Sequence, residues 1–202
     1  MHTIEKTPDS PVVSGALGWP FQGAWTYTDY LRLPEDDKRY EIIEGVLYVA
    51  NAPTPEHQFT VTELLFHLRQ HVSTHDLGIV LPAPVEVHLS ETTRPVQPDL
   101  IFIPKERQPA RGVRFIEGAP ALVIEVVSPT SIQRDRKVKY DLYERYGVAE
   151  YWIVDPQTCS VEVYTWSNGE YALFGQFVGE EMIESKLLSG LRIQTDLLFY
   201  TG

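Results

Sequence analysis

Three residues of this chain have the types and the setting for metal-assisted phosphodiester hydrolysis: Asp99, Glu125 and Lys139. Glu125 is the most unusual, because it interrupts the apolar run Ala121–Val127 (ALVIEVV). A carboxylate buried in such a strand costs several kcal/mol to desolvate unless a metal ion, a basic side chain or exposure at the strand end compensates it. The alternative without chemistry is a strand-end glutamate that faces water or pairs with an arginine.

Asp99 adds a second carboxylate at the start of another apolar run, Leu100–Ile103, directly after Pro98. Proline cannot donate to a strand ladder and restricts how the chain enters the strand. Two adjacent strands that each deliver one carboxylate to the same sheet edge would form an oxygen-ligand site for Mg²⁺, which proteins hold with one or two carboxylates plus substrate phosphate. A water on that ion is a better nucleophile, and the ion stabilises charge on the attacked phosphorus. Taken alone, Asp99 would be typical of a turn or a cap.

A helix is expected directly after Glu125. Ser128 and Pro129 are a suitable N-cap and first helical residue, and Gly147 suits the left-handed position that follows a helix end.

Asp135, Lys139 and Tyr143 are spaced by four residues, so they lie along one stripe of this helix. Lys139 can therefore reach back toward Glu125, where it would orient the attacking water or neutralise charge in the transition state. The alternative is an ordinary Asp135–Lys139 surface pair, worth a few tenths of a kcal/mol.

The elements expected around these residues form a mixed α/β domain, with a central sheet and helices packed against it. Residues 1–23 are expected to form a loose N-terminal arm and residues 24–202 the folded domain. Hydrophobic periodicity and turn signals predict a short helix within Thr26–Leu33, a hairpin over Arg39–Val49, a helix from Pro55 to about Thr74, one or two strands within Gly78–Leu89, strands over Leu100–Ile103, Ala121–Val127 and Tyr151–Val154, a C-terminal hairpin of Val161–Trp166 and Glu170–Phe174, and a strand near Met182–Ile183.

Composition sets limits on partners and compartment. The net charge of -11 argues against nucleic acid at face value, but residues 94–145 hold ten basic and seven acidic residues and so form a locally basic section. No apolar stretch approaches the length of a membrane span, no signal peptide is apparent, and the single Cys159 suits a reducing cytoplasm. No Ser-His-Asp motif, glycine-rich phosphate loop or zinc spacing offers a rival chemistry.

The spaced residues resemble the Uma-two family, which belongs to the PD-(D/E)XK, or restriction-endonuclease-like, superfamily. The resemblance covers roughly residues 24–200. It rests on Pro98-Asp99, on Ile124-Glu125-Val126-Val127-Ser128-Pro129, on Asp135-x-x-x-Lys139-x-x-x-Tyr143-x-x-x-Gly147, on Glu150-Tyr151-Trp152-Ile153-Val154-Asp155, and on the earlier Tyr40-Glu41-Ile42-Ile43-Glu44-Gly45 and Pro53…His57 segments.

The resemblance implies a restriction-endonuclease-like fold with a metal pair at Asp99 and Glu125. The superfamily usually has its lysine two residues after the acid, where this chain has Val127, whereas the family carries the lysine on the following helix, as Lys139 is here. Glu41 is a candidate third metal ligand, and pairing with a neighbouring arginine is an equal alternative.

Three further residues are possible accessories of the site. His57 would line the cleft, although a histidine at the N-terminus of a helix is more often structural. Asp135 and Tyr143 share the stripe of Lys139.

The leading hypothesis is an endonuclease that uses Mg²⁺ or Mn²⁺ to hydrolyse phosphodiester bonds, with DNA as substrate. A homodimer is expected, because a small nuclease that cuts duplex DNA often needs two sites, and the aromatic segment Phe174–Val178 is a candidate interface. The second hypothesis is a catalytically silent nucleic-acid-binding or assembly module on the same fold. A third is another hydrolase or a metal-binding regulator.

Overall fold

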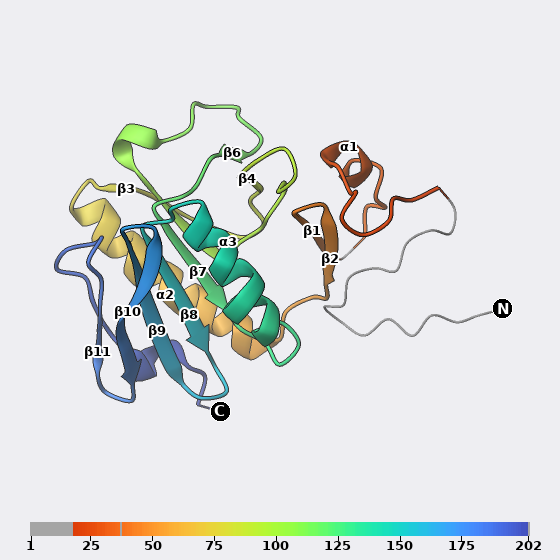
Figure 1. The fold of residues 1–202 in the computed structure, drawn as a ribbon. Coiled ribbons are helices and arrows are strands. Elements are labelled where there is room, and N and C mark those ends of the chain that lie inside the picture. The colour runs from red at the N-terminus through yellow and green to blue at the C-terminus, as the bar shows by residue number, and fades with distance from the viewer. Residues whose placement is uncertain (1–17, 37, 202) are drawn as a thin grey trace. The chain divides into compact units, whose positions relative to one another are not determined.

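The computed structural model describes residues 18–36 and 38–201, and most of the predicted N-terminal arm lies outside these residues (Figure 1). The chain divides into two compact units, which we describe separately. The larger unit comprises Pro53–Val85, Pro98–Val113 and the segment from Ala119 onward. The smaller comprises the described residues between Gly18 and Ala52, together with Glu86–Gln97 and Arg114–Gly118. No helix in the described part of the chain has the length and apolar character needed to cross a membrane.

The larger unit is built on a mixed sheet, which confirms the predicted fold class. Within the described residues the sheet has six strands in the order β10-β9-β8-β7-β5-β3. β7 and β8 pair in parallel and every other neighbouring pair is antiparallel. The strands are β3 (Gly78–Pro82), β5 (Leu100–Pro104), β7 (Leu122–Val126), β8 (Glu150–Asp155), β9 (Ser160–Ser167) and β10 (Glu170–Val178).

Helices cover both faces of this sheet. α2 (Pro55–Thr74) begins at the predicted proline, and its buried residues Leu64 and Leu68 join a hydrophobic core with Ile124 of β7. Because side chains alternate along a strand, Glu125 points to the opposite face. There it meets the helix that follows β7, and Figure 1 shows α2 behind the strands and α3 in front of them.

The helix after β7 ends as expected but is wound differently from the prediction. Gly147 follows its end with φ of 68°, the left-handed conformation that favours glycine. Ser128–Ser131 form a turn, in which Ser128 Oγ accepts the N–H of Ser131. The chain then forms a π-helix over Arg134–Lys139, which continues as the α-helix α3 (Tyr140–Arg145). Hydrophobic spacing does not distinguish a π-helical turn from an α-helical one, so the sequence did not reveal this segment.

The predicted C-terminal hairpin forms as β9 and β10 and extends the central sheet beside β8. The predicted strand near Met182 is β11 (Met182–Glu184), which pairs with β12 (Arg192–Gln194). Two short 3-10 turns, η1 (Lys105–Arg107) and η3 (Thr195–Leu198), complete the larger unit.

The smaller unit contains the predicted short helix and hairpin. α1 (Tyr27–Tyr30) is capped by Thr26, β1 (Arg39–Ile43) pairs with β2 (Val46–Ala50), and β4 (Val87–His88) pairs in parallel with β6 (Ile116–Glu117), which was not predicted. The hairpin turn needs glycine at position 45, because φ is positive there and a Cβ would lie 2.5 Å from the carbonyl oxygen of Gly23.

Candidate active site

Two carboxylates enter the site from neighbouring strands. β5 and β7 are antiparallel, and Leu100 faces Ile124 in their register. Asp99 directly precedes β5, and Glu125 directly follows Ile124 in β7, so the two carboxylates flank this pair of residues. Asp99 is 4% exposed and Glu125 is 2% exposed, so both carboxylates are shielded from water.

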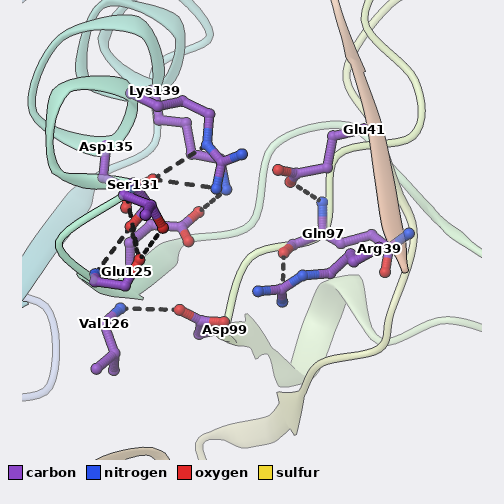
Figure 2. Close-up of polar contacts among 12 residues, drawn as sticks. Arg39, Glu41, Gln97, Asp99, Glu125, Val126, Ser131, Asp135 and Lys139 are labelled. Atoms are coloured by element: carbon purple, nitrogen blue, oxygen red, sulfur yellow. Dashed lines mark hydrogen bonds and ion pairs between the residues drawn. The ribbon is translucent and has the colours of Figure 1, made fainter. Parts of the chain in front are cut away.

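Glu125 is paired with a buried lysine. Its Oε1 accepts hydrogen bonds from Lys139 Nζ at 2.8 Å and from Tyr143 Oη at 2.8 Å. Lys139 is 1% exposed and Tyr143 is fully buried. The expected reach of Lys139 back to Glu125 is therefore present, and Figure 2 shows the two residues together. The alternative of a strand-end glutamate that faces water does not hold, since a lysine compensates a buried carboxylate.

Asp99 is held by a backbone amide and by a histidine. Its Oδ2 accepts the N–H of Val126 at 2.9 Å (Figure 2) and lies 3.2 Å from His57 Nε2. His57 is the third residue of α2, and its own N–H is capped by Thr54 Oγ1. The start of α2 thus brings His57 to Asp99, a contact that the sequence suggested only as a cleft-lining position.

Asp135 belongs to the same buried cluster. It is 2% exposed, and its Oδ1 lies 4.0 Å from Lys139 Nζ and 3.7 Å from Arg134 Nε. Burial raises the pKa of Asp135 above its ordinary value, although Lys139, Arg134 and a hydrogen bond from Ser131 act in the opposite direction. The Asp135–Lys139 pair is therefore an internal contact and not the solvated surface pair that was the alternative.

Glu41, the candidate third ligand, belongs to the smaller unit. It is 1% exposed, and its Oε1 accepts the N–H of Gln97 at 2.7 Å (Figure 2). Gln97 precedes Asp99 by two residues in the chain. The carboxylate of Glu41 thus contacts a backbone amide, and its part in metal binding stays a prediction.

Comparison with known proteins assigns the family. The model of the family Uma2, described as "Putative restriction endonuclease", matches residues 27–196. The chain belongs to the Uma2 family. The resemblance seen in the sequence is thereby confirmed, with nearly the same boundaries.

A solved structure shares the fold of this Uma2 chain. It is described as a "putative nuclease belonging to DUF820" from Anabaena variabilis ATCC 29413. The two chains superpose with a TM-score of 0.72 at 21% sequence identity, over 86% of this chain and 97% of the other. No curated protein matches the Uma2 chain. The structural match confirms the expected fold, a central mixed sheet flanked by helices.

The donor set of this Uma2 member fits a hard divalent cation. Asp99 and Glu125 supply carboxylate oxygens, the ligands that Mg²⁺ and Mn²⁺ prefer, and no sulfur ligand lies among the residues described above. Among residues 18–36 and 38–201, no group of three or more histidine, cysteine, aspartate or glutamate residues is arranged to hold a metal. Mg²⁺ in proteins usually keeps several waters and is held by one or two carboxylates together with substrate phosphates.

The acidic residues of the Uma2 site raise the pKa of a neighbouring tyrosine. Tyr151 is fully buried, and its pKa lies well above 10.0, first because of burial and then because of the charges of Glu125, Asp135 and Asp99. Its Oη donates a hydrogen bond of 3.0 Å to the backbone oxygen of Asp135. The sequence predicted a strand that begins at Tyr151 but gave this residue no part in the site. The available signal was strand alternation, since Tyr151 is two residues from Ile153, the residue that faces Glu125 across the parallel pair.

Proposed function

We propose that this Uma2 member is a metal-dependent endonuclease that hydrolyses phosphodiester bonds in DNA. The observation that carries the proposal is the buried contact of Lys139 Nζ with Glu125 Oε1, at 2.8 Å, on the strand next to Asp99. A scaffold gains little from a buried ion pair, because its desolvation cost rivals its attraction and an apolar pair would do as well. Family membership supports the same class of reaction.

Asp99 and Glu125 would hold the Mg²⁺ or Mn²⁺ ion. The bound ion would supply an activated water and a Lewis acid for the phosphoryl oxygens. His57 and Tyr143 keep the two carboxylates in fixed orientations through their contacts with Asp99 Oδ2 and Glu125 Oε1.

Lys139 provides the fixed positive charge of the site. Its ammonium group is already oriented by Glu125 and shielded from water, so it needs no reorganisation when negative charge develops on a phosphate. In such a low-dielectric setting the same charge is worth more than it would be in water. We therefore assign to Lys139 the stabilisation of the transition state or the orientation of the attacking water.

DNA is the proposed substrate because the site lies within the locally basic section of an otherwise acidic chain. Residues 94–145 include Asp99, Glu125 and Lys139 and hold ten basic against seven acidic residues. The overall charge of -11 would disfavour long non-specific contacts with phosphates and favour a short basic contact region. The proposal includes a homodimer, which supplies the two sites that duplex cleavage needs, and a cytoplasmic location.

The test is cleavage of supercoiled plasmid and of single-stranded DNA with Mg²⁺, Mn²⁺ or EDTA. Glu125→Gln, Asp99→Asn and Lys139→Met should each abolish metal-dependent cleavage, and Asp141→Asn, an exposed acid on α3, is the matched control that should not. Equal background cleavage by wild type and Glu125→Gln would overturn the enzyme assignment. DNA binding without turnover would instead favour a catalytically silent binding module. Light scattering of the purified protein tests the dimer.

A further inference from the structure

The helix that carries Lys139 changes its winding within the site. It is a π-helix over Arg134–Lys139 and an α-helix over Tyr140–Arg145. π-helical turns are rare and frequently lie at functional sites. This segment carries two residues of the stripe Asp135, Lys139 and Tyr143.

The π-helical and α-helical segments rotate the stripe of side chains around the helix axis in opposite directions. In an α-helix, a step of four residues turns through about 400°, so a stripe of such steps drifts by about 40° each time. In a π-helix, which bonds residues five apart and has about 4.4 residues per turn, the same step turns through about 330°. The step from Asp135 to Lys139 is π-helical and the step from Lys139 to Tyr143 is α-helical. The three side chains therefore stay close to one line, where a uniform α-helix would spread them over about 80°.

The contacts agree with this alignment. Lys139 Nζ and Tyr143 Oη both lie 2.8 Å from the same atom, Glu125 Oε1. Asp135 Oδ1 lies 4.0 Å from Lys139 Nζ, on the preceding turn. The ammonium group thus has a carboxylate in hydrogen-bond contact and a second one just beyond it.

Burial of the Asp135 carboxylate costs free energy of desolvation. It is 2% exposed, and within the described residues its Oδ1 makes no hydrogen bond. Its ion pairs with Arg134 Nε and Lys139 Nζ, at 3.7 and 4.0 Å, are longer than hydrogen bonds and offset only part of the cost of desolvation. A carboxylate kept at this cost points to a role in the site.

We propose that Asp135 is a positioning residue that holds the Lys139 ammonium group in register with Glu125. The proposal rests on the proposed function, because it acts through the residue to which that function assigns the positive charge. Asp135 does not bond to Lys139 as Glu125 does. Its Oδ1 lies 4.0 Å from Lys139 Nζ, on the preceding helical turn, so that the ammonium group has a second carboxylate beside it as well as Glu125.

Hydrogen bonds to two strands hold the π-helical segment, and with it Asp135, in place. Tyr151 Oη donates to the backbone oxygen of Asp135 at 3.0 Å. On another side of the segment, Arg136 makes two hydrogen bonds to Glu162, of 2.8 and 2.9 Å. Both anchors come from strands of the central sheet, so the segment is tied to the same rigid element that carries Glu125.

The experiment follows the Lys139 ammonium group directly. In ¹⁵N-labelled protein at low temperature and mildly acidic pH, a buried ammonium group that is shielded from exchange gives a ¹H–¹⁵N signal. The signal that disappears in Lys139→Met is assigned to Lys139. Asp135→Asn should shift or broaden that signal, and the matched control Asp141→Asn should leave it unchanged. In the cleavage assay, Asp135→Asn should lower kcat by about 10–100-fold with little change in KM. Asp135→Glu, which restores the charge, should recover the signal and part of the turnover.

Two results would overturn the proposal. One is an ammonium signal in Asp135→Asn identical to that of the wild type. The other is an Asp135→Glu protein with the same ammonium signal and the same kcat as Asp135→Asn. If Asp135→Asn does not fold, Asp135→Glu is compared with the wild type, and an Asp135→Glu protein without the ammonium signal overturns the proposal. Because the ammonium signal needs no substrate, an inactive wild type would refute the proposed function and leave the positioning test intact.

Discussion

Lys139 Nζ lies 2.8 Å from Glu125 Oε1 at a place where both side chains are almost fully shielded from water. A buried ion pair of this kind adds little net stability, but removing one partner strands the other charge. The stability of single and double variants therefore measures the structural coupling of the two residues separately from their role in the reaction.

Lys139→Met should lower the free energy of unfolding by about 3–5 kcal/mol, because the Glu125 carboxylate loses its buried counter-charge. Adding Glu125→Gln to this variant should restore most of that stability, since the amide is neutral and can still accept the bond from Tyr143. Neither protein should cleave DNA. Urea unfolding with EDTA measures the cycle, and stability losses that simply add in the double variant would contradict the coupling of the two residues.

Tyr143→Phe removes one hydrogen bond to the Glu125 carboxylate and leaves the ring in the core. Bonds to charged groups contribute about 1.5–3 kcal/mol, so we expect a loss of stability in that range. The carboxylate keeps Lys139, so turnover should fall by less than in Lys139→Met. Tyr146→Phe, one turn on in the same chain segment, is the control. A Tyr143→Phe protein as stable as this control would show that the hydroxyl contact contributes nothing.

Glu150 is a buried carboxylate of a different kind. It is fully buried, and it accepts bonds from Trp152 Nε1, Ser185 Oγ and the N–H groups of Lys186 and Leu187. Glu150→Gln places an amide donor against some of these donors and should cost roughly 2–5 kcal/mol of stability. The turnover per folded molecule should stay unchanged, in contrast to Glu125→Gln. A selective loss of kcat in folded Glu150→Gln would show that this carboxylate also serves the site.

Glu162 should make a pH-dependent contribution to stability. Burial acts to raise its pKa, but hydrogen bonds from Arg136 and Tyr164 outweigh burial and hold the pKa below 4.5. A carboxyl whose pKa is lower in the folded protein stabilises it above the unfolded pKa, and this contribution is lost as the pH falls through the folded pKa. The stability difference between wild type and Glu162→Gln should therefore be largest near neutral pH and shrink below about pH 4.5. Urea midpoints across that range test this, and a difference that grows on acidification would contradict it.

Much of the fold followed from local patterns. The helix beginning at Pro55 has its cap and its apolar stripe within one segment, and the hairpin at Glu44-Gly45 has its turn residues between two apolar runs. The short strand β6 (Ile116–Glu117) was missed, because two residues carry no periodicity and pair only with β4, far away in the sequence. The same distinction holds for the site. The carboxylates of Asp99, before one strand, and of Glu125, within the next, were visible in the sequence. The contact of His57 with Asp99 depends instead on where α2 packs.

The sequence by itself determined that Asp99 precedes one apolar strand, that Glu125 lies within another and that Lys139 follows on a helix, because strand and helix periodicity are properties of neighbouring residues. Only the tertiary structure decided that Lys139 is buried against Glu125, and that the segment Arg134–Lys139, which contains Asp135, winds as a π-helix. Both depend on groups distant in the chain, such as Tyr151 and Glu162, whose bonds to this segment no local pattern encodes. The candidate chemistry was therefore readable from the chain, and its geometry was set by packing.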